Sequence, residues 1–253
     1  MNTLIEIMEE ETKQKKADTL SAIKNNKVKS TKKPRRTTSM YKSNGVLKAR
    51  AAEPLKSIED IKSVMDYFLN SDQQFKYRNY LMFVLGIHVG RRAGDILRFK
   101  VGDVYDFNSR QVVPKIYIIE EKTRKPVYLY LNEQVRNAVE LYLSNKYKYE
   151  DINSDDWLFY SRKKDKDGNH KVSVSSAWKI LNDAAKDLKL EVHMGTHTMR
   201  KIFGYKVYNE CPNTKEALST LQDMFNHSSQ KMTLNYIGIT EESKQQIMLN
   251  LNY

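Results

Sequence analysis

Cysteine is almost absent from this 253-residue chain, because Cys211 is the only one. A single thiol cannot form an internal disulfide or a cysteine-built metal cluster, and such usage is typical of a reducing compartment. No apolar run approaches the roughly 20 residues that a membrane-spanning helix needs. The opening stretch "MNTLIEIMEEETKQKK" is too acidic and too weakly apolar for a signal peptide. We therefore expect a cytoplasmic protein with no membrane partner.

Acidic residues are also in deficit. Asp and Glu number 31 against 43 Lys and Arg, which gives a formal charge of +12. Residues 1–50 hold 13 basic and 5 acidic residues, so this fifth of the chain supplies +8 of the total. Such an excess favours a polyanionic partner, with nucleic acid first. A basic run is more often a solvated tail than a specific site, so charge alone does not decide for DNA.

The apolar pattern divides the chain into a basic N-terminal arm, residues 1–54, and a globular region, residues 55–253. Residues 24–50 are polar and basic with almost no apolar periodicity, which predicts a largely flexible arm. We expect this arm to hold DNA through salt-sensitive phosphate contacts. Its candidate DNA-binding residues are Lys32, Lys33, Arg35 and Arg36.

Helical periodicity dominates the globular region. Ser57 with Asp60 is typical of a capping box and predicts a helix start, and a second, strongly apolar helix should stop at Gly90. Between residues 101 and 131 the segments "QVVPKIYIIEE" and "KPVYLYLN" have the composition of strands. Helical spacing then returns, including a helix with Thr196 as its N-cap. The prediction is an α+β, mostly helical domain with a small three-stranded antiparallel sheet.

Four basic or histidine residues lie near the ends of these predicted elements. Arg92 follows the turn after the apolar helix, and Lys122 lies in the turn between two strands. His197 and Arg200 share one helix face at i, i+3. Guanidiniums bind the non-bridging oxygens of a phosphodiester and stabilise charge in its pentavalent transition state. A lysine can protonate a leaving oxygen, histidines can handle protons, and a tyrosine hydroxyl can be the nucleophile.

Three sequence boxes, in this order and spacing, resemble those of the tyrosine recombinase (phage integrase) family. "VGRRAGDILRFKVGDV" resembles the first arginine box and "THTMRKIFGY" the His-x-x-Arg box. "FNHSSQKMTLNYIG" is similar to the box in which a tyrosine follows a histidine by nine residues. "EEKTRKPVYLYL" also resembles the lysine-bearing β-hairpin turn of the family. The resemblance covers about residues 55–253 and implies a mostly helical catalytic domain with a small sheet.

The resemblance implies a role for each matching residue. Tyr236 would be the nucleophile, the two arginines would clamp the phosphate, and the lysine would be the general acid for the 5′-hydroxyl. The histidines would complete the site, and Asp95 would orient the arginine and histidine side chains. The implied catalytic residues are Arg92, Lys122, His197, Arg200, His227 and Tyr236.

Several positions depart from the family pattern. Arg91 stands where leucine or methionine is usual, which leaves open a shift of the arginine assignment by one residue; the box spacing favours the second arginine. Asp95 replaces the usual glutamate, Lys201 a frequent second histidine, and Asn226 the glycine before the site histidine. The family generally has a helical core-binding domain of about a hundred residues before the catalytic one, whereas about 54 residues precede it here.

We predict a site-specific DNA recombinase that cleaves and rejoins DNA through a 3′-phosphotyrosyl intermediate, with no cofactor, metal or ATP. Within the same chemistry, a type IB topoisomerase-like activity is an alternative. A non-catalytic DNA-binding module derived from a recombinase is another. A metal-dependent nuclease would need converging carboxylates, for which Asp95, Asp103 and Asp106 are the candidates.

The expected partner is double-stranded DNA at paired recombination sites. The final segment "EESKQQIMLNLNY" is amphipathic through Ile247, Met248, Leu249 and Leu251, and it is too short to be stable alone. Packing on its own domain is one possibility. The family resemblance instead implies that this C-terminal helix docks into a neighbouring protomer and links a homotetramer on DNA.

Overall fold

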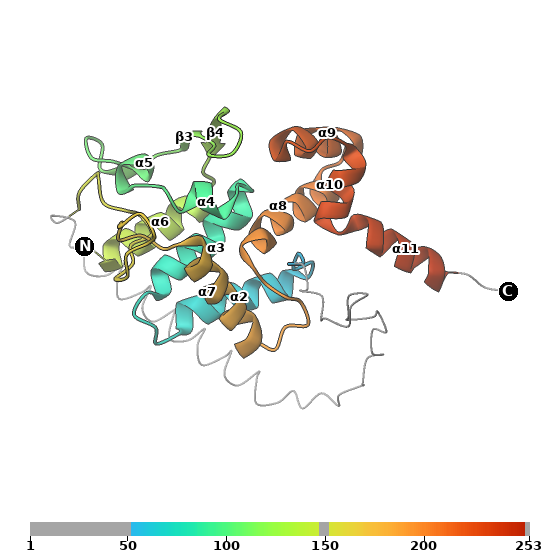
Figure 1. Ribbon diagram of the computed structural model, residues 1–253, viewed down its shortest axis with the longest axis horizontal. Helices are drawn as coiled ribbons and strands as arrows, with labels where there is room; N and C mark the ends of the chain where they lie inside the picture. The colour runs from blue at the N-terminus through green and yellow to red at the C-terminus, as the bar shows by residue number, and fades with distance from the viewer. Residues whose placement is uncertain (1–51, 147–151, 251–253) are drawn as a thin grey trace, which may run out of the picture. The chain divides into compact units, whose positions relative to one another are not determined.

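The structure is a computed structural model that describes residues 52–146 and 152–250 (Figure 1). Within these ranges no helix is long and apolar enough to cross a membrane. The predicted basic arm lies almost wholly outside the described residues, and its role stays a prediction. The same holds for the candidate DNA contacts Lys32, Lys33, Arg35 and Arg36.

Helices make up most of the described chain, with short strands between α5 and α6, so the α+β, mostly helical prediction is confirmed. The helices are α2 (Ile58–Asn70), α3 (Lys76–Val89), α4 (Ala93–Ile96), α5 (Val101–Val104), α6 (Glu133–Lys146), α7 (Val174–Asp187), α8 (Thr196–Glu210), α9 (Thr214–Phe225), α10 (Gln230–Ile237) and α11 (Ile239–Leu249).

Local sequence explains where most of these helices begin and end. The Ser57 hydroxyl accepts hydrogen bonds from the backbone N–H groups of the first turn of α2, which confirms that N-cap. Helix α3 ends at Gly90, as predicted, in the left-handed conformation with φ of 61°. The prediction of Thr196 as an N-cap is wrong by one residue. Gly195 is the N-cap of α8, and its N–H donates to the Thr198 hydroxyl at 3.0 Å.

The predicted three-stranded sheet is divided into two two-stranded antiparallel ladders. Strand β1 (Tyr105–Asp106) pairs with β2 (Gln111–Val112), and β3 (Lys115–Ile119) pairs with β4 (Pro126–Tyr130). Pro114 lies between β2 and β3, and proline has no N–H to donate to a ladder. The prediction of a small antiparallel sheet in this region is confirmed, but the number of strands in the described chain is four instead of three, and the strands form two ladders separated at the proline.

Two hydrophobic clusters meet at helix α8. The larger cluster lies where α3 contacts α2, α6 and α8, and α3 is buried along nearly its whole length. The smaller cluster consists of Leu221, Phe225 and Ile237 and joins α9 and α10 to α8. Figure 1 shows α8 between α3 and the α9–α10 pair. Residues on α8 can therefore interact with both the arginine box and the segment that carries Tyr236.

Candidate active site

The structure brings together the predicted site residues from four separate segments of the chain. They come from the α3–α4 junction, the β3–β4 turn, α8, and the segment from the end of α9 through α10. Their charges and rings interact with one another. The six residues are Arg92, Lys122, His197, Arg200, His227 and Tyr236.

Tyr236, on α10, points its hydroxyl toward α8. A hydrogen bond of 3.1 Å joins this hydroxyl to Nδ1 of His197. The tyrosine ring packs edge-on against His227 and Phe225, with centroid distances of 5.1 and 5.5 Å. Lys201, the residue at the position where the family often has a second histidine, has its Nζ 5.0 Å from the centre of the same ring. The phenol is therefore held among two histidines, an aromatic ring and a lysine.

A glycine on α8 allows α10 to approach this closely. A Cβ atom on Gly204 would lie 2.6 Å from Cγ2 of Ile237 and 2.9 Å from the ring of Phe225. Both distances are shorter than van der Waals contact allows, so only glycine fits between α8 and these neighbours. Because Ile237 directly follows Tyr236, the close packing at Gly204 sets the position of the tyrosine beside His197.

Arg200 is buried beneath the tyrosine and its guanidinium is fixed before any ligand binds. Its Nη1 donates to the Gly90 carbonyl at 3.0 Å, and its Cζ lies 4.2 Å from the centre of the Phe225 ring. Burial, together with the charges of Arg91 and Arg92, lowers the pKa of Arg200 to about 10. The guanidinium is still charged at neutral pH, and an anion beside it would relieve the repulsion.

The two adjacent arginines of the first box face different surroundings. Arg91 is buried, and its Nη1 contacts Glu120 Oε1 at 3.3 Å and the Met224 carbonyl at 3.0 Å. Arg92 is 25% exposed at its side chain. The charge of Arg92 lowers the pKa of Tyr236 and of both site histidines, whereas Arg91 does not contribute to those shifts. The geometry therefore favours Arg92 as the residue that faces the site and gives Arg91 a structural contact.

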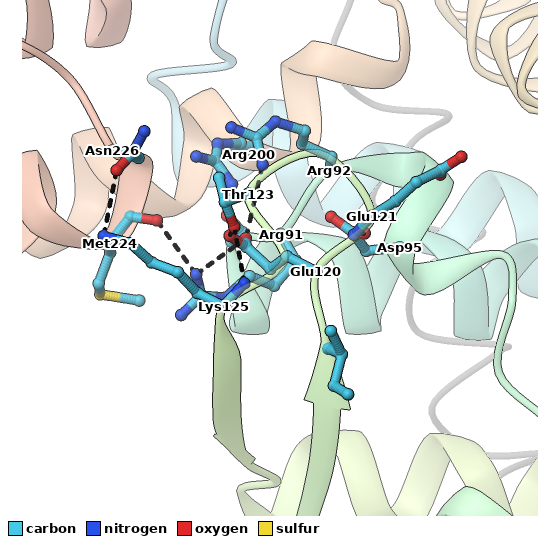
Figure 2. A network of polar contacts seen from close by, with 12 residues as sticks. Arg91, Arg92, Asp95, Glu120, Glu121, Thr123, Lys125, Arg200, Met224 and Asn226 are labelled. Carbon is cyan, nitrogen blue, oxygen red and sulfur yellow. Dashed lines mark hydrogen bonds and ion pairs between the residues drawn. The ribbon is translucent and has the colours of Figure 1, made fainter.

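Glu120 is a buried residue of this site that the sequence reasoning missed. Its carboxylate contacts both arginines of the first box and accepts a hydrogen bond from Thr123 (Figure 2). Burial alone would raise its pKa, but the Thr123 hydroxyl and the three nearby arginines outweigh this and hold the pKa below its usual value. A signal was present: Ile116 and Ile118 on β3 and Glu120, the residue after its end, are the less exposed positions of an alternating pattern. A charge at such a position indicates a buried ion pair.

Asp95 does not make the contacts expected of it. Its Oδ1 accepts from Arg98 Nη2 at 3.3 Å and from the backbone N–H of Glu121 at 2.8 Å, and its Oδ2 is buried with no hydrogen-bond partner. No hydrogen bond joins it to a site arginine or histidine in the described ranges. Aspartate is one methylene shorter than the usual glutamate, and here it reaches the hairpin backbone instead. Asp95 thus anchors the lysine-bearing turn.

Lys122 lies in that turn with an exposed side chain. No described residue forms a hydrogen bond or ion pair with its ammonium, but its charge is among those that lower the pKa of His197. Lys125, a second lysine close to this turn, donates from Nζ to Asn226 Oδ1 at 3.2 Å. These contacts favour Lys122 as the lysine that faces the histidine and Lys125 as a structural link.

Asn226 explains a departure from the family glycine. It follows the last residue of α9 with φ of 53° and ψ of 48°, the left-handed region in which asparagine is the common alternative to glycine. Its side chain also binds Lys125, an interaction that glycine cannot make. The substitution therefore keeps the turn before His227 and ties it to the β3–β4 hairpin.

Both site histidines have pKa values below the usual one. For His197 the causes are burial and then the charges of Arg200, Lys201, Arg92 and Lys122. For His227, whose Nδ1 is 3.1 Å from the Thr233 hydroxyl, they are burial and then the two arginines. Burial raises the pKa of Tyr236, against the opposing effect of the same arginines. At neutral pH the site therefore holds a protonated phenol beside a neutral imidazole that can accept its proton.

Comparison with known proteins identifies the family of this chain. The model of the phage integrase family matches residues 56–243. The probable integrase/recombinase YoeC of Bacillus subtilis (strain 168) is 34% identical over 192 residues, which cover 76% of this chain and 92% of that protein.

Two solved structures share the fold. XerA recombinase superposes with a TM-score of 0.56 at 18% identity, over 81% of this chain and 68% of its own. XerH site-specific recombinase, bound to a palindromic difH substrate in a post-cleavage complex, has a TM-score of 0.55 at 16% identity, over 78% of this chain and 55% of its own.

Proposed function

The chain belongs to the phage integrase family, and from this premise we propose that it is a site-specific DNA recombinase whose Tyr236 forms a 3′-phosphotyrosyl intermediate. The observation that carries the proposal is the 3.1 Å hydrogen bond between the Tyr236 hydroxyl and His197, within reach of the Arg92 and Arg200 charges. A DNA partner is supported by membership of the family and by the shared fold of XerH site-specific recombinase, which was solved bound to its palindromic difH substrate.

The cleavage step follows from the protonation states of these groups. Neutral His197 accepts the phenol proton while the Tyr236 oxygen attacks phosphorus. A bond forms between that oxygen and phosphorus, and the bond from phosphorus to the 5′-oxygen breaks. Lys122 donates a proton to the leaving 5′-oxygen, which becomes a hydroxyl. In rejoining, a 5′-hydroxyl attacks the ester, so the bond energy is conserved and neither ATP nor a metal enters the balance.

The arginines supply charge stabilisation in this mechanism. The transition state carries more negative charge on the non-bridging oxygens than the bound diester does, and fixed guanidiniums near it stabilise that charge. Arg200 is held by the Gly90 carbonyl and the Phe225 ring, so little reorganisation is needed when DNA binds. Arg92 has a partly exposed side chain, so its guanidinium is accessible to a bound phosphate.

A covalent adduct is the direct test. Denaturing the protein after incubation with a plasmid library, and sequencing the DNA that stays attached to it, would identify a cleavage site. A nicked duplex bearing that site should then trap the wild-type protein covalently. Tyr236→Phe should form no adduct, whereas Tyr130→Phe, a change at a tyrosine that is 75% exposed on β4, should react like the wild type. An adduct of normal yield with Tyr236→Phe would refute the nucleophile assignment.

We also propose that α11 links protomers into a homotetramer on paired DNA sites. In the described chain α11 contacts chiefly α10, and Figure 1 shows it extending beyond that helix. Its Met248 and Leu249 are 71% and 68% exposed. Exposed apolar side chains on a terminal helix favour burial against another surface. If each tail enters the next subunit, the contact is heterologous and closes as a ring.

A further inference from the structure

One carboxylate joins three segments of the candidate site (Figure 2). Glu120 Oε1 lies 3.3 Å from Arg91 Nη1 and 3.5 Å from Arg92 Nη1. Its Oε2 accepts a hydrogen bond of 2.5 Å from the Thr123 hydroxyl. Arg91 Nη1 also donates to the Met224 carbonyl at 3.0 Å. The arginine box, the lysine-bearing turn and the end of α9 therefore share a single polar network.

The nearby arginines stabilise the ionised Glu120 carboxylate, and its negative charge in turn allows the two guanidiniums to lie close together. Its side chain is only 4% exposed, so an ionised carboxylate is favourable there only while cations stay close. The two arginine Nη1 atoms both approach the same oxygen, which brings two positive charges near each other. Without the intervening negative charge these guanidiniums would repel, and the partly exposed one would move toward solvent.

Arg92 relies on Glu120 more than Arg200 does. Across residues 52–146 and 152–250, the ion pair with Glu120 is the polar contact that orients the Arg92 side chain, and Arg92 Nη1 is buried with no hydrogen bond. Arg200 instead has a carbonyl acceptor and an aromatic ring beneath it. Asp95, the residue expected to orient the arginine, bonds to the hairpin backbone.

We propose that Glu120 is a positioning residue for DNA cleavage, acting by holding the Arg92 guanidinium where it contacts the scissile phosphate. Glu120 itself touches neither phosphate nor leaving group, because it is buried behind the arginine. The inference rests on the proposed recombinase function and adds to it a residue that acts through the clamp. Thr123 supports the same arrangement by fixing the second carboxylate oxygen.

Glu120→Gln tests the idea because it removes the charge and keeps the side-chain size. On the nicked duplex described above, single-turnover cleavage should slow by about tenfold to a hundredfold, the usual effect of a misplaced catalytic group. DNA affinity should change little. The matched control is Glu121→Gln, which removes the same charge from the adjacent, exposed residue and should cleave at the wild-type rate.

A modified phosphate separates a positioning role from a merely structural one. A methylphosphonate replaces one charged non-bridging oxygen with methyl, so an arginine has no charge to stabilise there. If Glu120 acts through Arg92, then Glu120→Gln and Arg92→Ala should both come within about threefold of the wild type on this substrate, because the stabilisation they lack is no longer required. A defect that persists on the methylphosphonate would overturn the proposal.

A second substrate tests whether Glu120 acts through the turn that carries Lys122 instead of through Arg92. Sulfur at the 5′-bridging position leaves as a thiolate without a proton from Lys122. Rescue of Glu120→Gln by this substrate, and not by the methylphosphonate, would mean that the residue acts through the lysine turn and would contradict the proposal. If Glu120→Gln fails to fold in a thermal melt, Glu120→Asp keeps the charge, withdraws it by one methylene, and should show a smaller defect with the same rescue.

The controls separate this inference from the proposed function. If the wild-type protein forms no covalent adduct with any DNA, the recombinase proposal fails. If the wild type cleaves and Glu120→Gln cleaves equally fast, only the positioning role fails.

Discussion

Gly204 offers a test of how the position of the tyrosine depends on helix packing. A methyl group in Gly204→Ala would lie 2.6 Å from Cγ2 of Ile237 and 2.9 Å from the Phe225 ring. Carbon atoms pack at about 3.5–4.0 Å, so α10 must move away from α8 by about 1 Å. Tyr236 precedes Ile237 and should move with it. The 3.1 Å hydrogen bond to His197 would then open to about 4 Å, which is too long for a hydrogen bond.

The expected effects on stability and on catalysis differ in size. Overpacking costs about 1–3 kcal/mol, and alanine in place of a helical glycine regains about 0.5–1 kcal/mol. The net loss of about 0–2.5 kcal/mol corresponds to a fall in Tm of at most about 10 °C for a domain of this size. Misplacement of the nucleophile by about 1 Å should slow cleavage by about a hundredfold. DNA affinity should be nearly unchanged, because Arg92 and Arg200 lie outside α10, the helix that moves.

The assay is single-turnover cleavage of the nicked duplex, with DNA affinity and Tm measured on the same preparations. Asn209→Ala is the control, because it places the same residue on an exposed position of α8. It should cleave at the wild-type rate. If Gly204→Ala also cleaves at the wild-type rate, or loses affinity as much as rate, then the packing of α8 on α10 does not set the position of the tyrosine.

Three further predictions concern charge, pH and assembly. Arg92→Ala should slow cleavage by at least about a hundredfold and leave DNA affinity nearly unchanged. Arg91→Ala should chiefly lower Tm, because it leaves the buried Glu120 carboxylate with one partner fewer. The reverse result would assign the phosphate clamp to Arg91. Because the pKa of His197 lies below its ordinary 6.5 and the neutral form accepts the proton, the cleavage rate should rise with pH through a midpoint below 6.5 and be level by neutral pH, and a midpoint above 7 would contradict this role. Removing residues 243–253 should abolish recombination and synapsis but spare binding to a single site, and a truncated protein that recombines normally would refute docking of α11 in a neighbour.

Much of the fold could be predicted from the sequence because the relevant signals are local. The Ser57 cap, the stop of α3 at Gly90 and the helical spacing of α8 depend on residues within one or two turns of each other. The six candidate site residues were also identifiable, because their boxes keep a characteristic order and spacing. A local reading missed a one-residue shift of an N-cap and the division of the sheet at Pro114.

Only the tertiary structure decided what these residues meet. Arg91 and Arg92 are neighbours in sequence, yet one is buried against Met224 and the other faces the site, because the helix end at Gly90 turns them in different directions. The partner of Arg92 proved to be Glu120, although the family pattern indicated Asp95. Contacts between residues far apart along the chain depend on how whole helices and hairpins pack, and a carboxylate binds whichever cation that packing brings within reach.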